Sequence, residues 1–445
     1  MECVLKDLIA ISKDGEWGKG EPFDDSVEML AIRGTDFEDI RFGSTTSTPR
    51  RHIAKRHADR KLLQPWDVII EAAGGTKNQI TGRTVLLRPQ LFSRSELPFT
   101  CASFSRFIRF NTELCDPVFM FWYLQHLYAS GLMHAYHTQH TGVARFQWTT
   151  FSEREPLELP PLPVQQRIAG ILSAYDELME NSQRRIKILE SMVRTLYREW
   201  FVHFKFPGHE KVKLVPSPLG EIPKGWEVIP FETLLASMTG GDWGSDQTTE
   251  TESAEVTIVR GTDFDEVAYG GRLRAPVRYI KPASLKSRSL RPGDVIVENS
   301  INAKSRCIGT TLLVDSRVLA RIGRDAVAAS FCKVFRLHDP RLAPIVHLHF
   351  RRLREDARME YYQNVAANGI GNFQAQKFAK EEHLILPKDD ALRAKLITGI
   401  AAMFESISVL SSKLSNLRLT RDLLLPRLLS GQISLKTKDN NAAHN

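Results

Sequence analysis

Two stretches of the chain repeat apolar residues at alternating intervals of four and three positions, a spacing that predicts long amphipathic helices. In residues 168–200, nine of the ten positions on this seam are apolar, and Ser182 is the exception. In residues 396–428, nine of ten are again apolar, and Arg421 is the exception. Each seam would extend about 48 Å at a rise of about 1.5 Å per residue.

Two narrow seams of equal length favour one antiparallel coiled coil, in which each helix covers the apolar face of the other. In that register the guanidinium of Arg421 would lie near Tyr175, where a cation–π contact is possible. Asp389 is the expected N-cap of the second helix, and Gly431 is its expected C-terminal stop. The alternative is that the two helices are unrelated and pack on separate domains.

Outside these helices, short motifs recur at a constant offset. Residues 33–37 return unchanged as residues 260–264, 227 positions later, and the apolar runs 67–71 and 294–298 share this offset. Both apolar runs predict buried strands, and each is followed by a polar loop. Because solenoid repeats span only about 20–50 residues, this duplication predicts two tandem domains, each with its own core.

The predicted fold class is therefore α+β, with two pseudo-symmetric α/β domains joined by two long helices that form an antiparallel coiled coil. The predicted boundaries are residues 1–160 for the first domain, 161–206 for the central helix, 207–225 for a linker, 226–387 for the second domain, 388–431 for the C-terminal helix and 432–445 for a polar tail. The matched motifs keep a constant spacing, but the residues between them differ widely. The two domains should therefore present surfaces that are related in shape and distinct in chemistry.

Composition narrows the choice of partner. The 445 residues carry a formal net charge of +8, which favours a polyanionic partner, nucleic acid before an anionic membrane surface. No apolar run approaches the roughly 20 residues of a membrane span, and the N-terminus lacks the pattern of a signal peptide. The five cysteines show no metal-ligand spacing, which predicts reduced, buried thiols in a cytoplasmic protein.

Candidate nucleic-acid contacts occur at matched positions of the two halves. Basic clusters span residues 49–61 and 272–291, and a shared offset favours a phosphate-binding surface over two unrelated solvated faces. The polar loops after the predicted strands carry Lys, Arg, Asn and Gln, which can pair with phosphates or base edges. In the first half the candidates are Arg50, Arg51, Lys55, Arg56, Thr76, Lys77, Asn78, Gln79, Arg83 and Arg145. In the second half they are Lys281, Lys286, Arg288, Ser300, Asn302, Lys304, Arg306 and Asn372.

No catalytic constellation is visible. The sequence has no phosphate-binding GxxxxGK[ST] loop and no Asp/Asn-Pro-Pro-Tyr/Phe motif of amino-methyltransferases, so no cofactor is expected. The histidines at 134, 137 and 140 have metal-like spacing, but no acid or cysteine accompanies them, so surface histidines are expected there rather than a metal site. Phe146 and Phe373, at matched positions, are expected to be core anchors rather than base-stacking platforms.

The order of these motifs resembles the specificity subunit of type I restriction-modification systems over essentially the whole chain. The resemblance rests on the Trp-Gly and Arg-Gly-Thr-Asp-Phe motifs, the Asp-Val-Ile strand and its loop, and residues 157–168, which open the first helix. Residues 220–226 then open the second unit. One departure is that residues 388–392 lack the Pro-x-x-x-Gln entry usual before the second helix.

The resemblance implies two target-recognition domains, each of which reads one half of a bipartite site in double-stranded DNA. It also implies that the helices set the spacing between the half-sites and bind two modification (methyltransferase) subunits, and that restriction (translocase/endonuclease) subunits join the complex. On this reading the chain is not an enzyme and has no membrane partner. The alternatives are a self-contained DNA methyltransferase with its own recognition domain and a coiled-coil scaffold without a DNA role.

Overall fold

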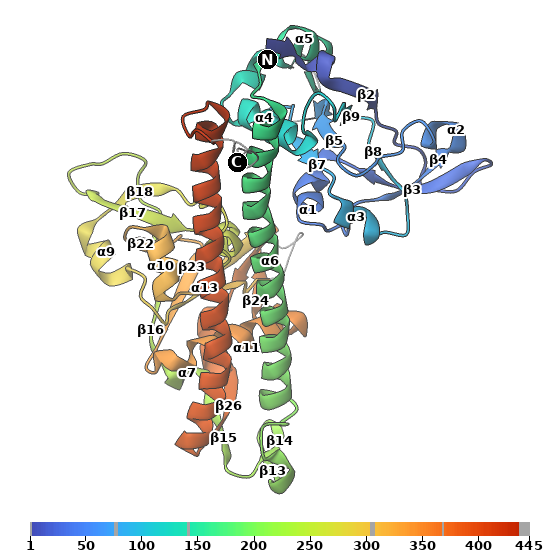
Figure 1. Cartoon of the computed structure of the whole chain (residues 1–445). Coiled ribbons are helices and arrows are strands. Elements are labelled where there is room, and N and C mark those ends of the chain that lie inside the picture. The colour runs from blue at the N-terminus through green and yellow to red at the C-terminus, as the bar shows by residue number, and fades with distance from the viewer. Residues whose placement is uncertain (1, 75–78, 140–142, 303–307, 367–368, 436–445) are drawn as a thin grey trace, which may run out of the picture. The chain divides into compact units, whose positions relative to one another are not determined.

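The chain folds into two compact units, each built from sheets, short helices and part of both long helices (Figure 1). The computed structural model describes residues 2–74, 79–139, 143–302, 308–366 and 369–435. Unit 1 comprises Met1–Glu180 with Leu419–Asn445, and unit 2 comprises Asn181–Arg418. The predicted recognition domains and their boundaries stay a prediction, and each unit is described by itself below.

Unit 1 contains a four-stranded antiparallel sheet of order β2-β9-β5-β7, and three-stranded sheets of order β4-β3-β8 and β10-β11-β6. Its strands are β1 (Glu2–Val4), β2 (Ile9–Asp14), β3 (Ser26–Ile32), β4 (Arg50–Ala54), β5 (Val68–Glu71), β6 (Ala73–Gly74), β7 (Thr84–Leu86), β8 (Phe99–Cys101), β9 (Ser105–Phe110), β10 (His137–Thr138), β11 (Ala144–Phe146) and β12 (Pro156–Glu158). Its short helices are α1 (Phe37–Arg41), α2 (Lys55–Ala58), α3 (Pro89–Ser93), α4 (Pro117–Ala129) and α5 (Trp148–Arg154).

Unit 2 repeats the same sheets in the same order, as β16-β23-β19-β21, β18-β17-β22 and β24-β25-β20. Its strands are β13 (Leu214–Ser217), β14 (Gly220–Pro223), β15 (Trp226–Pro230), β16 (Leu235–Gly240), β17 (Ala254–Val259), β18 (Val277–Ile280), β19 (Val295–Glu298), β20 (Ser300–Asn302), β21 (Thr311–Leu313), β22 (Ala326–Ala328), β23 (Cys332–Leu337), β24 (Gln363–Val365), β25 (Ile370–Phe373) and β26 (His383–Pro387). Its short helices are α7 (Phe231–Leu234), α8 (Phe264–Ala268), α9 (Pro282–Arg288), α10 (Ser316–Ile322), α11 (Ala343–Glu355) and α12 (Ala375–Glu381).

The predicted buried strands are confirmed, because all four residues of β5 and all four of β19 are buried. In each unit one strand pair is parallel, β3 with β8 and β17 with β22, while the other sheet pairings are antiparallel. This agreement in order and direction confirms the internal duplication at the level of the fold. The predicted linker is more regular than expected, because β13 and β14 form a hairpin within it.

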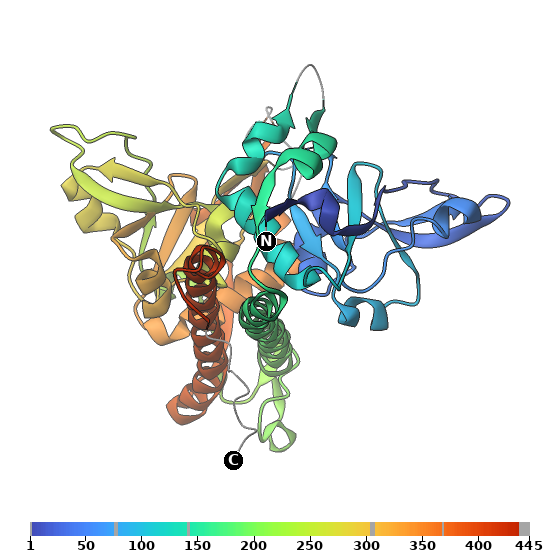
Figure 2. The same ribbon diagram turned by 45° about the horizontal axis from the view of Figure 1, so that its top comes forward.

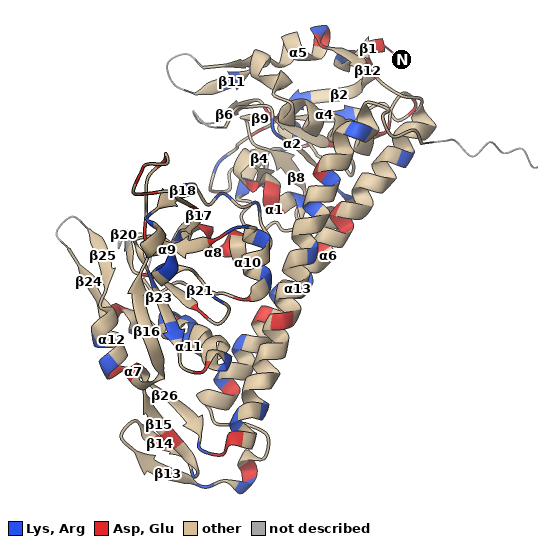
Figure 3. Cartoon of the chain, turned by 90° about the vertical axis from the view of Figure 1, so that its left-hand side faces the viewer, with Lys and Arg blue, Asp and Glu red and all other residues tan. Residues whose placement is uncertain are grey.

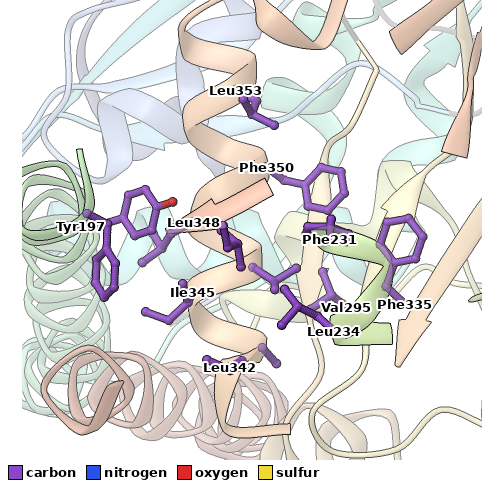
Figure 4. Close-up of a cluster of buried hydrophobic side chains, with 14 of the residues drawn as sticks. Tyr197, Phe231, Leu234, Val295, Phe335, Leu342, Ile345, Leu348, Phe350 and Leu353 are labelled. Atoms are coloured by element: carbon purple, nitrogen blue, oxygen red, sulfur yellow. The ribbon is translucent and has the colours of Figure 1, made fainter. Parts of the chain in front are cut away.

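Each unit has its own apolar core. In unit 2 the side chain of Phe350 from α11 stacks on Phe335 from β23, with ring centroids 5.6 Å apart, and meets Phe231 edge-on at 6.0 Å (Figure 4). Tyr197 joins this core from the long helix Leu162–Phe201, and its side chain is 3% exposed. The expected core anchors are confirmed, because Phe146 and Phe373 are both 5% exposed.

The long helices are α6 (Leu162–Phe201) and α13 (Asp390–Leu429), each of 40 residues. Asp389 caps α13 as predicted, since its Oδ1 accepts a hydrogen bond of 2.6 Å from the amide of Leu392. Gly431 follows the helix with a φ of 71°, a left-handed conformation that favours glycine and ends the helix.

The two helices run antiparallel wherever they meet within a unit (Figures 1 and 2). In unit 1, near the N-terminal end of α6, Asp176 pairs with Arg421 near the C-terminal end of α13. In unit 2, Trp200 at the end of α6 lies beneath Gly399 at the start of α13, where a Cβ would come within 3.2 Å of the indole. The predicted direction is therefore confirmed. The expected cation–π partner was wrong, because Arg421 lies over Trp122 of α4, 5.4 Å from its ring centroid, rather than over Tyr175.

By length and composition α13 could cross a membrane, since an 18-residue window of this helix has a mean hydropathy of 1.4. It is the one such helix in the described parts of the chain. We attribute its apolar character to packing, because its seam residues Ile407, Leu410 and Leu414 are buried in unit 2.

Candidate nucleic-acid interface

The Trp-Gly motif of each half builds an arginine–tryptophan stack. In unit 1 the guanidinium of Arg51 lies over Trp17, 4.4 Å from its ring centroid, and its Nε donates to the Trp17 carbonyl at 3.0 Å. In unit 2 Arg278 lies over Trp243 at 4.8 Å and donates to that carbonyl at 3.2 Å. Arg51, a predicted DNA contact, therefore has a structural role that unit 2 assigns to Arg278.

The identical pentapeptides also have a structural explanation. Arg33 donates to both carboxylate oxygens of Asp36, and Arg260 does the same with Asp263. Both aspartates are buried, and each also accepts a hydrogen bond from the backbone amide of its own arginine. The motif therefore stabilises the turn that follows β3 in unit 1 and β17 in unit 2, and its repetition reflects the fold rather than a shared ligand.

The two basic clusters differ in how much charge they leave exposed. In unit 1, Arg50, Lys55 and Arg56 are exposed, and Arg50 forms an ion pair of 3.7 Å with Glu28. We call these three residues the basic surface. In unit 2, Lys281 and Lys286 are exposed on and beside α9, while Arg288 donates to Asp242 at 3.1 Å.

The described candidate loop residues of unit 1 are Gln79, Arg83, which precedes β7, and Arg145 on β11. Arg83 donates to both carboxylate oxygens of Glu71, at 2.9 and 2.7 Å, so its guanidinium is held by a buried partner. Gln79 and Arg145 are exposed, and Arg145 projects from the middle of β11. Thr76, Lys77 and Asn78 lie outside the described residues.

In unit 2 the corresponding sheet is β24-β25-β20. The hydroxyl of Ser300 on β20 donates to Oδ1 of Asn372 on β25 at 2.9 Å, and Asn372 is exposed. Asn372 occupies the position that Arg145 has in unit 1, so equivalent sites of the duplicated sheet carry an amide and a cation. Lys304, Arg306 and the side chain of Asn302 lie outside what the structure describes.

Sequence reasoning missed a groove of about 530 Å³ beside this sheet in unit 2. It is lined by Met238, Asn299, Lys333, Phe373, Gln374, Ala375, Gln376 and Lys377. Figure 3 shows that β20, β24, β25 and α12 lie on the side of unit 2 away from its long helices. The sequence carried a partial signal, because Asn299 begins the polar loop after β19 and Phe373 occupies a matched position, whereas Lys333 joins the groove from β23 only through the fold.

Within the described residues, no group of three or more His, Cys, Asp or Glu side chains could hold a metal ion. Nδ1 of His137 lies 3.2 Å from the backbone amide of Thr81 and accepts from it, and His140 is outside the described part of the chain. The cysteines at 3, 101, 115 and 332 are free, and Cys307 is not among the described residues. Burial raises the pKa of Cys101 and of Cys332 to about 12, so neither thiol is suited to nucleophilic chemistry at neutral pH.

Comparison with known proteins gives the arrangement a context. No protein-family model matches the chain. The type I restriction enzyme MjaIX specificity subunit of Methanocaldococcus jannaschii is 31% identical over 140 residues, which are 31% of this chain and 32% of that protein. The MjaVIII specificity subunit of the same organism is 31% identical over 103 residues, 23% of each chain. The matched stretches thus span about a third of the length of these relatives or less.

The crystal structure of a type I restriction-modification system S subunit from M. genitalium superposes with a TM-score of 0.57 and 14% identity. The alignment covers 96% of this chain and 95% of that one. This chain has the fold of a type I specificity subunit. Its sequence also resembles the specificity subunits of M. jannaschii, so the expected resemblance is confirmed.

Proposed function

We propose that this chain is the sequence-specific DNA-recognition subunit of a type I restriction-modification complex and reads a bipartite, asymmetric site. The observation that supports this most directly is the duplicated sheet whose equivalent positions carry different side chains. Arg145 in unit 1 corresponds to Asn372 in unit 2, and arginine and asparagine favour different base edges, guanine and adenine respectively. Two sheets of the same fold that carry different side chains at equivalent positions would read two unlike half-sites.

The division of roles follows from the same features. The basic surface of unit 1 and the exposed lysines of α9 would contact phosphates, which fix position and orientation without reading sequence. The paired helices would set the length of the unread spacer and bind two modification subunits, with restriction subunits joining the cytoplasmic complex. The relatives bear the name of specificity subunits, which agrees with a chain that reads DNA and leaves methylation and cleavage to its partners.

The test is a selection from a randomised double-stranded DNA library by the complex of this chain with its modification subunit. The expected result is two short motifs of different sequence, separated by a spacer of constant length. A single contiguous motif would contradict the bipartite reading. Binding of S-adenosylmethionine by the isolated chain would support the rival function of a self-contained methyltransferase. A complex that binds no DNA at any salt concentration would support the scaffold.

A further inference from the structure

We propose that the groove of unit 2, between β16, β23 and α12, is a base-reading subsite for one half-site and that unit 1 has no counterpart. The inference deepens the proposed function and rests on it. The groove holds about 530 Å³, and three of its lining side chains are amides, those of Asn299, Gln374 and Gln376. This composition is unlike that of an apolar ligand pocket, which is lined mainly by hydrophobic side chains.

Asn299 is fixed in place by its backbone. Its amide N–H donates to the Phe331 carbonyl at 2.8 Å, and its own carbonyl accepts from the amide of Phe373 at 2.8 Å. Its side-chain Oδ1 is buried and has no hydrogen-bond partner among the described residues. An unpaired buried acceptor costs about 1–3 kcal/mol, and rotation of the side-chain amide into the groove, where a ligand can donate to Oδ1, would recover that loss.

The charge of the groove favours a polyanion. Lys333 and Lys377 line it, and no carboxylate is among its lining residues. Lys377 is held in position, since its Nζ lies 3.6 Å from the ring centroid of Tyr361 and donates to the Tyr361 carbonyl at 3.3 Å. For Lys333 the described residues provide no ion-pair partner, which leaves its ammonium group available to a phosphate.

Amides and lysines in one open groove fit the edge of a DNA base pair flanked by its phosphates. Asn and Gln bind adenine through N6 and N7 with paired hydrogen bonds, and lysine supplies the charge that holds the backbone nearby. Gln376 is exposed on α12, next to the groove wall, so its amide can reach a base edge without rearrangement of the core. We therefore assign base reading to Asn299 and Gln376 and phosphate binding to Lys333.

In unit 1 the positions that correspond to Lys333 and Ala375 carry larger side chains, and the cation among them is paired with a carboxylate. Arg106 replaces Lys333, and its guanidinium lies over Trp148, 5.4 Å from the ring centroid. Arg106 also forms an ion pair of 2.7 Å with Asp14 and donates to the hydroxyl of Ser12 at 3.1 Å. Trp148 occupies the position of Ala375 in unit 2, so an indole stacked with a guanidinium takes the place of the alanine and lysine that line the groove.

The experiment compares single alanine variants of the full chain in its complex with the modification subunit, using the randomised DNA library. Asn299→Ala and Gln376→Ala should each reduce the preference for the favoured base by about tenfold at one or two positions of one half-site. Lys333→Ala should keep the motif and reduce the slope of log affinity against log salt by about one. Lys380→Ala, which removes an exposed charge from α12 outside the groove, is the charge control. Thr149→Ala, the counterpart of Gln376 in unit 1, is the control for the other half.

The outcomes separate the two proposals. If the complex with the unsubstituted chain selects no sequence at all, the proposed function is refuted. If it selects a bipartite motif that both Asn299→Ala and Gln376→Ala leave unchanged, the function stands and the groove is refuted as a reader. Because Gln376 is exposed, its variant should fold even if Asn299→Ala does not, and thermal unfolding of each variant checks this. A change of preference in both half-sites would also refute the assignment to unit 2 alone.

Discussion

Replacing Asp176 by asparagine should destabilise unit 1 more than any other single removal of charge from its long helices. The Asp176 carboxylate, 2% exposed, accepts hydrogen bonds from Arg41 at 3.0–3.1 Å, from Arg88 at 3.1 Å and from Arg421 at 2.9 Å. These arginines come from α1, from the segment before α3 and from α13, while Asp176 itself is on α6. One carboxylate therefore joins four segments of unit 1.

The magnitude follows from burial. The side chains of Arg41, Arg88 and Arg421 are 19%, 18% and 12% exposed, so water can replace only part of a lost partner. Burial lowers the pKa of Arg41, and the charge of Asp176 opposes that shift. Removing one partner of a buried ion pair costs about 3–5 kcal/mol, and we expect a loss in that range for Asp176→Asn.

The matched control is Asp422→Asn. Asp422 pairs with the same guanidinium, that of Arg421, at 2.7 Å, but its side chain is 46% exposed. Exposed pairs contribute about 0–1 kcal/mol, so this variant should unfold almost like the unmodified chain. Urea unfolding of the full chain measures both free energies, and hydrogen exchange of α4 amides shows whether unit 1 carries the change. Equal losses for the two variants, or a loss below about 1 kcal/mol for Asp176→Asn, would show that the buried ion pairs of Asp176 do not stabilise unit 1 to this extent.

Three further predictions concern other parts of the molecule. Gly241→Ala should destabilise unit 2 by several kcal/mol, because the new Cβ would lie 2.0 Å from the carbonyl oxygen of Ala329. Gly170→Ala should instead stabilise its helix by about 1 kcal/mol, because its new Cβ would meet no atom within 4 Å, and thermal unfolding measures both changes. Burial lowers the pKa of His347 from 6.5 to about 3, so between these pH values only the unfolded chain takes up this proton. His347 should therefore contribute a loss of stability of about 1.4 kcal/mol per pH unit as the pH falls from 6.5 towards 3, and the total loss should be less steep in His347→Asn. Neutralising the basic surface should weaken binding to all DNA sequences alike and flatten the salt dependence, and a changed motif would reassign these residues to bases.

The parts of the fold that were predictable from the sequence are those with a local, periodic cause. The heptad seams gave the two long helices and their direction, and the apolar runs gave β5 and β19, because each pattern lies within a single element. The hairpin of β13 and β14 was missed, because turn residues dominate residues 207–225 and hide two short strands.

The candidate site was less predictable, because its contacts join distant segments. Arg51 could not be assigned to Trp17 from a separation of 34 positions, nor could Lys333 be placed beside Asn299 without the pairing of β19 with β23. Arg421 was placed at the correct level of the helix pair, but its cation–π partner, Trp122, came from α4. Charge and loop position thus indicated the kind of partner, while the fold decided which side chains remain available to it.

We propose that the two units read two different half-sites at a fixed separation. Single-molecule sequencing of genomic DNA from the host, with and without the gene for this chain, tests it most directly. We expect methylated bases in a motif of two unlike half-sites with a constant unread spacer, and the loss of this methylation when the gene is deleted. Methylation that persists without the gene, or a lost motif that is contiguous, would contradict it.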